Sequence, residues 1–121
     1  KEFITSIFKR EHIKANNLEV IFCSDEYLLN INRNYLKHDF YTDIITFDLS
    51  QPGDSFLNAE IYISSERVKE NAVNFKTSFQ NELHRVIFHG VLHLCGYKDK
   101  SKQDIEIMRR KENEYLKAYL I

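Results

Sequence analysis

Two histidines, His89 and His93, lie four residues apart in a segment whose apolar residues recur with helical spacing. Positions four apart stack on one face of an α-helix, so both imidazoles can reach one metal ion at about 2.0–2.1 Å. Gly96 allows the left-handed conformation that ends a helix, and Asp99 follows it. Three such ligands with a fourth position open to water are typical of a catalytic zinc site. We therefore predict one zinc ion on His89, His93 and Asp99; two hydrogen-bonded histidines at a helix edge are the alternative.

The residue after the first histidine argues against a peptidase. Zinc peptidases of the HExxH type carry a glutamate there as general base, and in this chain the position is Gly90. A metallopeptidase is therefore the weaker of the enzyme hypotheses.

Three further residues are candidates for catalysis. Asp43 and Glu60 lie near the starts of predicted strands, where a polar pair can face a cleft; solvated or capping acids are the alternative. Arg85 lies one turn before His89 on the same side of the helix. It can hold a substrate phosphate or pair with Glu82.

Basic residues crowd around the predicted metal site and the start of the last helix: Lys98, Lys100, Lys102, Arg109, Arg110 and Lys111. Such runs are usually solvated surfaces. Beside a metal they suit a phosphodiester substrate, although the formal net charge of −1 gives no global attraction to nucleic acid.

Length and composition favour one domain over residues 1–121, with 43% hydrophobic residues to form a core. The chain begins with Lys1 rather than Met, so we expect that an N-terminal piece is missing. Cys23 and Cys95 are too few for a disulfide scaffold and are expected to be buried thiols. No signal peptide and no apolar run of about 18 residues occurs, which predicts a cytoplasmic protein without a membrane partner.

Hydrophobic periodicity predicts an α+β fold, with a small mixed β-sheet of three or four strands packed with four or five helices. The predicted strands are residues 18–23, 42–49 and 58–63, and residues 2–15 form the first predicted helix. The later helices begin at the capping residues Ser24, Ser64 or Ser65, Thr77, and Ser101. Their expected buried residues are Leu28, Ile31, Tyr35, Val68, Ala72, Phe75, Ile105, Met108, Tyr115 and Tyr119.

The segment from His89 to Tyr97, His-Gly-Val-Leu-His-Leu-Cys-Gly-Tyr, resembles the signature of the YbeY family of bacterial metalloproteins. Three more stretches agree in order: Leu29-Asn30 leading to Tyr35, residues 42–47, and residues 59–68. The similarity covers nearly the whole chain from Leu18 onward. It implies an α+β fold and a cytoplasmic, zinc-dependent endoribonuclease specific for single strands. The implied role is 16S rRNA 3′-end maturation and ribosome biogenesis, with ribosomal RNA and the ribosome or its proteins as partners. We expect a monomer.

Two positions depart from the family pattern. Asp99 stands where members usually carry the third histidine ligand, which makes the site less positive and favours harder ions. Leu36 stands where many members carry an arginine. If that arginine binds RNA phosphate, its role here is vacant or falls to Lys37, His38, Arg33 or Arg85.

The resulting hypothesis is that zinc lowers the pKa of a bound water and polarises a phosphoryl oxygen of RNA. Asp43 or Glu60 would orient that water or the free N–H of a ligand histidine. The rival from another class is a non-catalytic ribosome-assembly factor, in which a structural metal ties the helix to the turn that follows it.

Overall fold

The computed structural model describes residues 2–120 of the chain, and in this range it contains five helices and three strands. The helices are α1 (Glu2–Arg10), α2 (Asp25–Tyr35), α3 (Ser65–Asn74), α4 (Phe79–Leu94) and α5 (Lys102–Leu120). The strands are β1 (Ala15–Cys23), β2 (Ile44–Asp48) and β3 (Leu57–Ser64). The predicted α+β fold is confirmed. Among the helices of the described range, none is both long enough and apolar enough to span a membrane.

The sheet is mixed, and β3 is its central strand. β1 pairs with β3 in parallel, with Val20 opposite Ile61, whereas β2 pairs with β3 antiparallel, with Ile44 opposite Ile63. The antiparallel pair is joined by the loop that contains Pro52 and Gly53, as the turn residues predict. The parallel pair needs the longer connection through α2 and β2.

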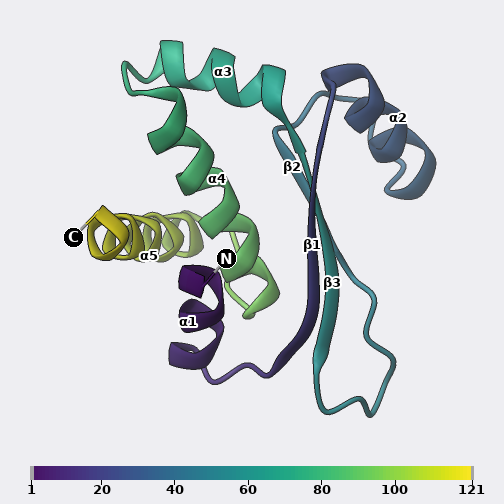
Figure 1. The fold of residues 1–121 in the computed structure, drawn as a ribbon. Coiled ribbons are helices and arrows are strands. Elements are labelled where there is room, and N and C mark those ends of the chain that lie inside the picture. The colour runs from purple at the N-terminus through teal and green to yellow at the C-terminus, as the bar shows by residue number, and fades with distance from the viewer. Residues whose placement is uncertain (1, 121) are drawn as a thin grey trace.

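The two faces of the sheet are covered differently (Figure 1). Alternate residues of β3 are buried, because side chains point to opposite faces of a strand. Ile61 and Ile63 join the main core with Val91 and Leu92 of α4, and α1 and α5 close that core from outside. On the other face, α2 packs on the sheet through a smaller cluster formed by Leu28, Ile31 and Ile45.

The first helix is shorter than predicted. α1 ends at Arg10, and Ala15, expected in the helix, is the first residue of β1. The cause is local: His12 adopts a left-handed conformation with φ 62°, and the amide N–H of Ile13 donates to the Phe8 carbonyl oxygen at 2.9 Å. This turn closes the helix and sends the chain into the sheet.

Four apolar residues expected in the core are exposed: Tyr35 (73%), Phe75 (59%), Ile105 (49%) and Tyr119 (43%). All four lie in the first or last turn of a helix or immediately after it. Helical spacing places them on the correct stripe, but at a helix end the neighbours cover only part of the side chain: Tyr119 contacts the rings of Phe3 and His84 and still stays exposed. The starts of the helices agree better with the prediction: Ser24 and Ser64 cap α2 and α3. The cap of α4 is Ser78 rather than Thr77.

A single carboxylate ties the start of the chain to its end. Glu11, which follows α1, accepts hydrogen bonds from the hydroxyls of Tyr97 (2.8 Å) and Tyr115, and Lys111 Nζ lies 3.7 Å from it. Burial on its own raises the pKa of Glu11, but these three partners outweigh it and hold that pKa below its ordinary value. The ionised form of Glu11 is therefore stabilised by folding.

We expect Glu11→Gln to lower the free energy of unfolding at neutral pH by about 2 kcal/mol, since hydrogen bonds to a charged group contribute roughly 1.5–3 kcal/mol. Because the pKa of Glu11 is lower in the folded than in the unfolded chain, this contribution is complete above the unfolded value, near 4.5. It is lost as pH falls further, through the folded pKa. Urea unfolding of both proteins at pH 7 and near pH 3 should show that the difference in their free energies of unfolding becomes smaller at acid pH. A difference that stays constant would contradict the stabilising role of the ionised Glu11.

Candidate metal centre

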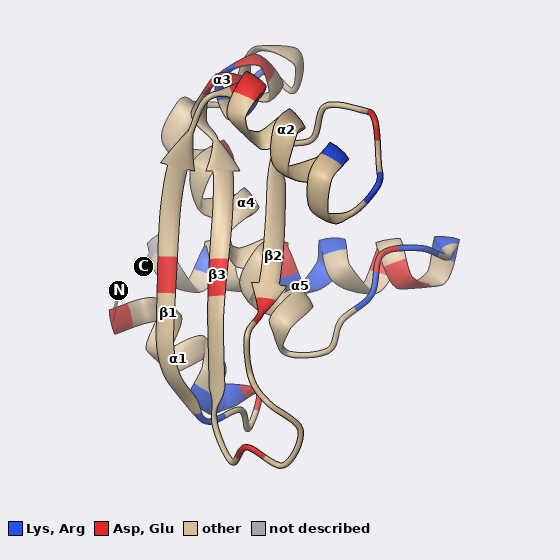
Figure 2. Cartoon of the chain, turned by 90° about the vertical axis from the view of Figure 1, so that its right-hand side faces the viewer, with Lys and Arg blue, Asp and Glu red and all other residues tan. Residues whose placement is uncertain are grey.

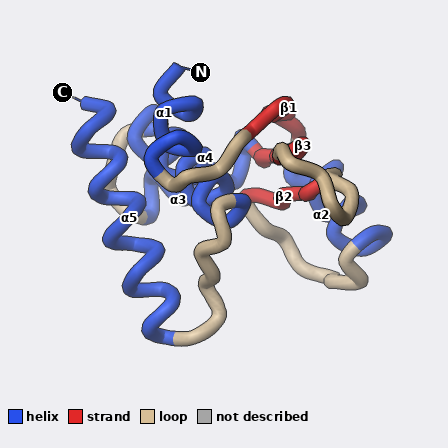
Figure 3. The backbone as a smooth tube through the Cα atoms, turned by 90° about the horizontal axis from the view of Figure 1, so that it is seen from below, coloured by secondary structure: helices blue, strands red, loops and turns tan. Residues whose placement is uncertain are grey.

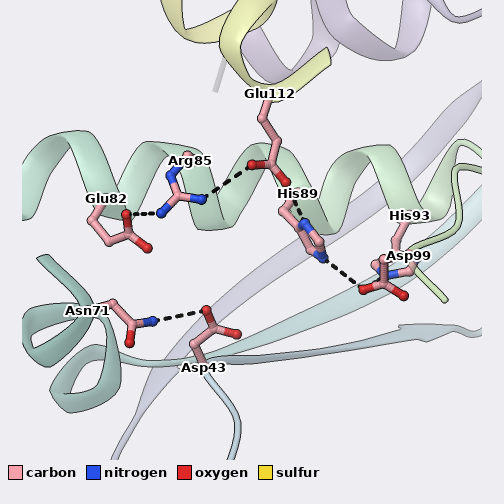
Figure 4. Close-up of polar contacts among 8 residues, drawn as sticks. All are labelled: Asp43, Asn71, Glu82, Arg85, His89, His93, Asp99 and Glu112. Atoms are coloured by element: carbon pink, nitrogen blue, oxygen red, sulfur yellow. Dashed lines mark hydrogen bonds and ion pairs between the residues drawn. The ribbon is translucent and has the colours of Figure 1, made fainter. Parts of the chain in front are cut away.

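The end of α4 brings the two predicted histidines and the predicted aspartate together (Figure 4). Helix α4 stops at Leu94, and Gly96, with φ 107°, turns the chain so that Asp99 lies against the helix. Asp99 Oδ2 lies 3.1 Å from His93 Nε2 and 3.4 Å from His89 Nε2. All three donor atoms lie within 4.8 Å of one another. The predicted trio thus forms one cluster.

Gly90 explains why the histidines sit at the edge of the core rather than inside it. A Cβ atom at this position would lie 2.6 Å from Ile44 Cδ1 and 3.2 Å from Thr46 Cγ2. Gly90 is therefore the residue of α4 that lies against the sheet, and its neighbour His89 projects from the flank of the helix. Glycine allows the close approach of the helix to the sheet here, and a glutamate has no room.

Glu112 of α5 holds the other nitrogen of His89. Its Oε2 atom lies 2.5 Å from His89 Nδ1, so Nδ1 carries the donated proton and Nε2 is directed toward Asp99. Burial alone lowers the pKa of His89, but Glu112, with Asp99 and Asp43, outweighs it and raises that pKa. A carboxylate behind a histidine is the usual support for a metal ligand, because it fixes the tautomer and the ring orientation.

Arg85 is held by two buried carboxylates. It pairs with Glu82 within α4, and its second nitrogen lies 3.4 Å from Glu112 Oε1. Both acids are nearly inaccessible, at 2% and 4% side-chain exposure, whereas Arg85 keeps 16%. Of the two roles considered for Arg85, the pairing with Glu82 is the one found. A continuous chain of contacts runs from Glu82 through Arg85 and Glu112 to His89 (Figure 4).

The two candidate acids lie on different sides of the sheet. Asp43 precedes β2 and lines a cavity of about 380 Å3 together with His89 and Asp99. Burial raises the pKa of Asp43, and the nearby charges of His89 and Arg85 offset only part of this effect.

Glu60 does not join this site. It is the fourth residue of β3, pairs across the sheet with Phe47, and accepts a hydrogen bond from Tyr62 at 3.1 Å. Phe47 and Tyr62 belong to the cluster under α2, whereas α4 packs on the opposite face. The prediction that Glu60 faces the histidines is wrong, because strand alternation directs its side chain away from them.

The basic residues divide into free and paired ones. Lys98, Lys100, Lys102, Arg109 and Arg110 are exposed, on the loop before α5 and on α5 itself (Figure 2). Lys111 is engaged by Glu11 and Glu114. In the view from below, the loop between α4 and α5 extends away from the sheet and leads to the start of α5 (Figure 3). Cations therefore flank the site in spite of the formal net charge of −1.

Glu112 was missed in the sequence, although a signal was present. It follows Met108 by four residues and precedes Tyr115 by three, so it lies on the apolar stripe of α5. An acid on a buried stripe needs a partner, which is itself a sign of function or of an ion pair. Cys95, which follows α4, has its pKa raised to about 12 by burial and by Glu11. It stays a neutral thiol.

Comparison with known proteins agrees with this arrangement. The sequence model of the family described as endoribonuclease YbeY matches residues 1–120. The chain belongs to the YbeY family. A protein of Flavobacterium psychrophilum named endoribonuclease YbeY is 51% identical over 97% of this chain and 82% of its own length. One from Christiangramia forsetii with the same name is 48% identical over 98% of this chain and 82% of its own length.

The fold of this YbeY family member is also found in a solved structure. A solution structure of a Thermotoga maritima protein has a TM-score of 0.65 and 31% sequence identity, covering 95% of this chain and 75% of that one. The resemblance inferred from the histidine segment is confirmed over almost the full chain.

Proposed function

We propose that this protein is a zinc-dependent endoribonuclease that cuts single-stranded RNA, with zinc held by His89, His93 and Asp99. The observation that carries the proposal is the spacing of the donor atoms. Ligands about 2.0–2.1 Å from a tetrahedral zinc ion are roughly 3.4 Å from one another. The Asp99 oxygen lies 3.1 and 3.4 Å from the two Nε2 atoms, so these two pairs match such an ion, and the two histidine donors lie within 4.8 Å of each other. The family supports the activity, since its named relatives are endoribonucleases.

The finer role follows the family resemblance. We place this chain in the cytoplasm as a monomer that trims the 3′ end of 16S rRNA during ribosome biogenesis, with ribosomal RNA and the ribosome as partners. The exposed lysines and arginines next to the metal ligands support a polyanionic substrate.

The residues around the ligands have separable tasks. A bound zinc ion would supply Lewis-acid chemistry, by lowering the pKa of water and polarising a phosphoryl oxygen. Glu112 keeps the proton of His89 on Nδ1 and thereby presents Nε2. Asp43, half-buried in the cavity that His89 lines, accepts a proton from the attacking water while the P–O bond to the leaving oxygen breaks, and the proton then passes to that oxygen. Arg109 and Lys98, both exposed, contact phosphates of the strand.

The exposure of the donors favours catalysis over a purely structural metal. The side chains of His89, His93 and Asp99 are 24%, 31% and 40% exposed. A closed structural site would bury its ligands and take a fourth one from the protein. Within residues 2–120, the cluster of possible ligands around these histidines contains only three members.

The test of the proposal is removal and return of the metal. Treatment with a chelator should abolish cleavage of an unstructured RNA oligonucleotide, and one equivalent of zinc per chain should restore it. Mn²⁺ and Mg²⁺ are compared in parallel because the Asp99 oxygen also suits harder ions. Undiminished cleavage by metal-free protein would refute the metal-dependent mechanism. Intact RNA with zinc-loaded protein would refute the activity itself.

We expect Glu112→Gln to weaken zinc binding by about 10–100-fold, the usual effect of losing a carboxylate that orients a ligand histidine. The amide oxygen of glutamine can still accept the Nδ1 proton, but it lacks the negative charge that makes Nε2 of His89 a stronger ligand. Competition with a chromophoric chelator measures the change. Glu106→Gln, which alters an exposed acid of the same helix, is the matched control and should bind zinc like the parent protein. Equal affinities of both variants would contradict the role of Glu112.

A further inference from the structure

The cavity beside His89 is lined in part by residues that the metal site does not use. Its volume is about 380 Å3, within the range of small-ligand sites. His89 and Asp99 line one part, and Asp43, Asn71, Phe75 and Arg109 line the rest. Asp43 and Asn71 face the polar side chains of α4 across this space (Figure 4). Whatever occupies the cavity therefore touches the proposed metal ligands.

Phe75 is an aromatic ring held at the opening of this cavity. It is the C-cap residue of α3, its amide N–H bonds the Asn71 carbonyl, and Lys76 follows in a left-handed conformation. The ring is 59% exposed, and the guanidinium carbon of Arg85 lies 5.4 Å from its centroid. Arg85 is in turn fixed by Glu82 and Glu112. Arg85, which lines the same cavity, thus lies over one face of the ring, and the exposed remainder of the ring is available for stacking.

The charges inside the cavity disfavour a phosphate. Four carboxylates, of Asp43, Glu82, Asp99 and Glu112, line it against the two guanidiniums of Arg85 and Arg109. Arg85 is already paired with two of those acids, so only Arg109 is left to attract an anion. An uncharged, flat, polar group is suited to the lining away from the metal ligands, with the phosphate held by the metal and Arg109.

Asn71 provides a group that can distinguish one such ligand from another. The hydrogen bond from its Nδ2 to Asp43 Oδ2 is long, at 3.3 Å. This bond uses one N–H, so the amide still offers the carbonyl oxygen and another N–H. A donor beside an acceptor is the pattern that matches the edge of a nucleobase.

We propose that this cavity holds one unpaired base of the RNA strand, stacked on Phe75 and hydrogen-bonded by Asn71, next to the phosphate that is cut. The inference rests on the proposed endoribonuclease function and names the part of the substrate that the site selects. A base in the cavity has left its helix, so cleavage is confined to single strands. Any base can stack on Phe75, whereas hydrogen bonds with Asn71 favour the binding of some bases over others.

The experiment uses zinc-loaded protein and short unstructured RNAs that differ at one position, which carries A, C, G, U or the fluorescent base 2-aminopurine. Phe75→Leu keeps apolar volume but removes the stacking face, and Phe75→Trp restores one. We expect Phe75→Leu to raise KM about 5- to 100-fold with a smaller change in kcat, and Phe75→Trp to restore the KM. Asn71→Ala should narrow the spread of kcat/KM among the four bases.

A second measurement does not depend on cleavage. On mixing with the wild-type protein, 2-aminopurine fluorescence should fall as the base stacks, and Phe75→Leu should remove this fall. Tyr27→Leu is the matched control, because Tyr27 is 54% exposed on α2 across the sheet. It should behave like the wild type in both measurements.

The outcomes separate the two proposals. Quenching that Phe75→Leu leaves intact, or a KM that responds equally to Phe75→Leu and Tyr27→Leu, would overturn the base pocket even if RNA is cut. Quenching that depends on Phe75 in a protein that leaves RNA uncut would support the base pocket and overturn the nuclease.

Discussion

His93→Ala is expected to lose RNA cleavage by roughly 1,000-fold or more. The metal is expected to stabilise the charge that develops in the transition state by several kcal/mol, and each 1.36 kcal/mol is a factor of ten in rate. His93 Nε2 is the donor atom nearest to Asp99, at 3.1 Å, so its removal leaves His89 and Asp99 as an incomplete set. Zinc content by mass spectrometry and initial cleavage rates measure the two effects together.

The controls for this prediction lie in the same helix and at the third ligand. His84→Ala removes a histidine of α4 that packs against Phe88 and Tyr119, and it should keep both zinc and activity. Asp99→Ala should resemble His93→Ala, whereas Asp99→His should retain zinc. If wild type and His93→Ala cut RNA equally well, the activity belongs to a contaminating nuclease.

Gly90→Glu is expected to destabilise the protein by about 4 kcal/mol or more, although it would complete an HExxH sequence. Overpacking a core costs about 1–3 kcal/mol, and an unpaired buried carboxylate adds several more. At this position even a Cβ atom would lie 2.6 Å from Ile44 Cδ1. The glutamate would therefore point at the sheet rather than at the metal, and no peptidase would result.

Thermal unfolding measures this effect, with two comparisons. Asn81→Glu adds the same charge to an exposed position near the start of α4 and should change the stability by less than about 0.5 kcal/mol. Gly90→Ala should cost far less than Gly90→Glu, because the terminal methyl of Ile44 can move and alanine favours helix by about 1 kcal/mol. A stable Gly90→Glu protein would show that α4 can shift away from the sheet.

The metal ligands were predictable because their geometry is local. His89 and His93 belong to one helix, and Gly96 and Asp99 follow within one turn of chain, so helical spacing and one glycine fix the trio. Glu112 was not predictable in the same way, because its contact with His89 depends on how α5 packs across α4. Residue type alone indicates only that a buried acid needs a partner.

The errors in the predicted fold also arise from packing between elements that are distant in the sequence. Spacing within a helix predicts the apolar stripe but not where the neighbouring elements end, so Phe75 and Tyr35 were expected in the core. Glu60 was expected beside Asp43, because a sequence does not state which face of a strand a helix will cover. The three strands themselves were predictable from alternation and the turn residues, but the prediction left their number at three or four and did not include the direction of their pairing.

The hydrogen bonds that Glu11 accepts from Tyr97 and Tyr115 also bear on how the chain folds as it is synthesised. Its partner Tyr115 is 104 residues farther along, which corresponds to about 5–20 s of translation at roughly 5–20 residues per second. Until then Ile7 and Phe8, which end up buried, lack the last part of the core that covers them. In the nascent chain the apolar side of α1 therefore stays partly uncovered until α5 has been synthesised.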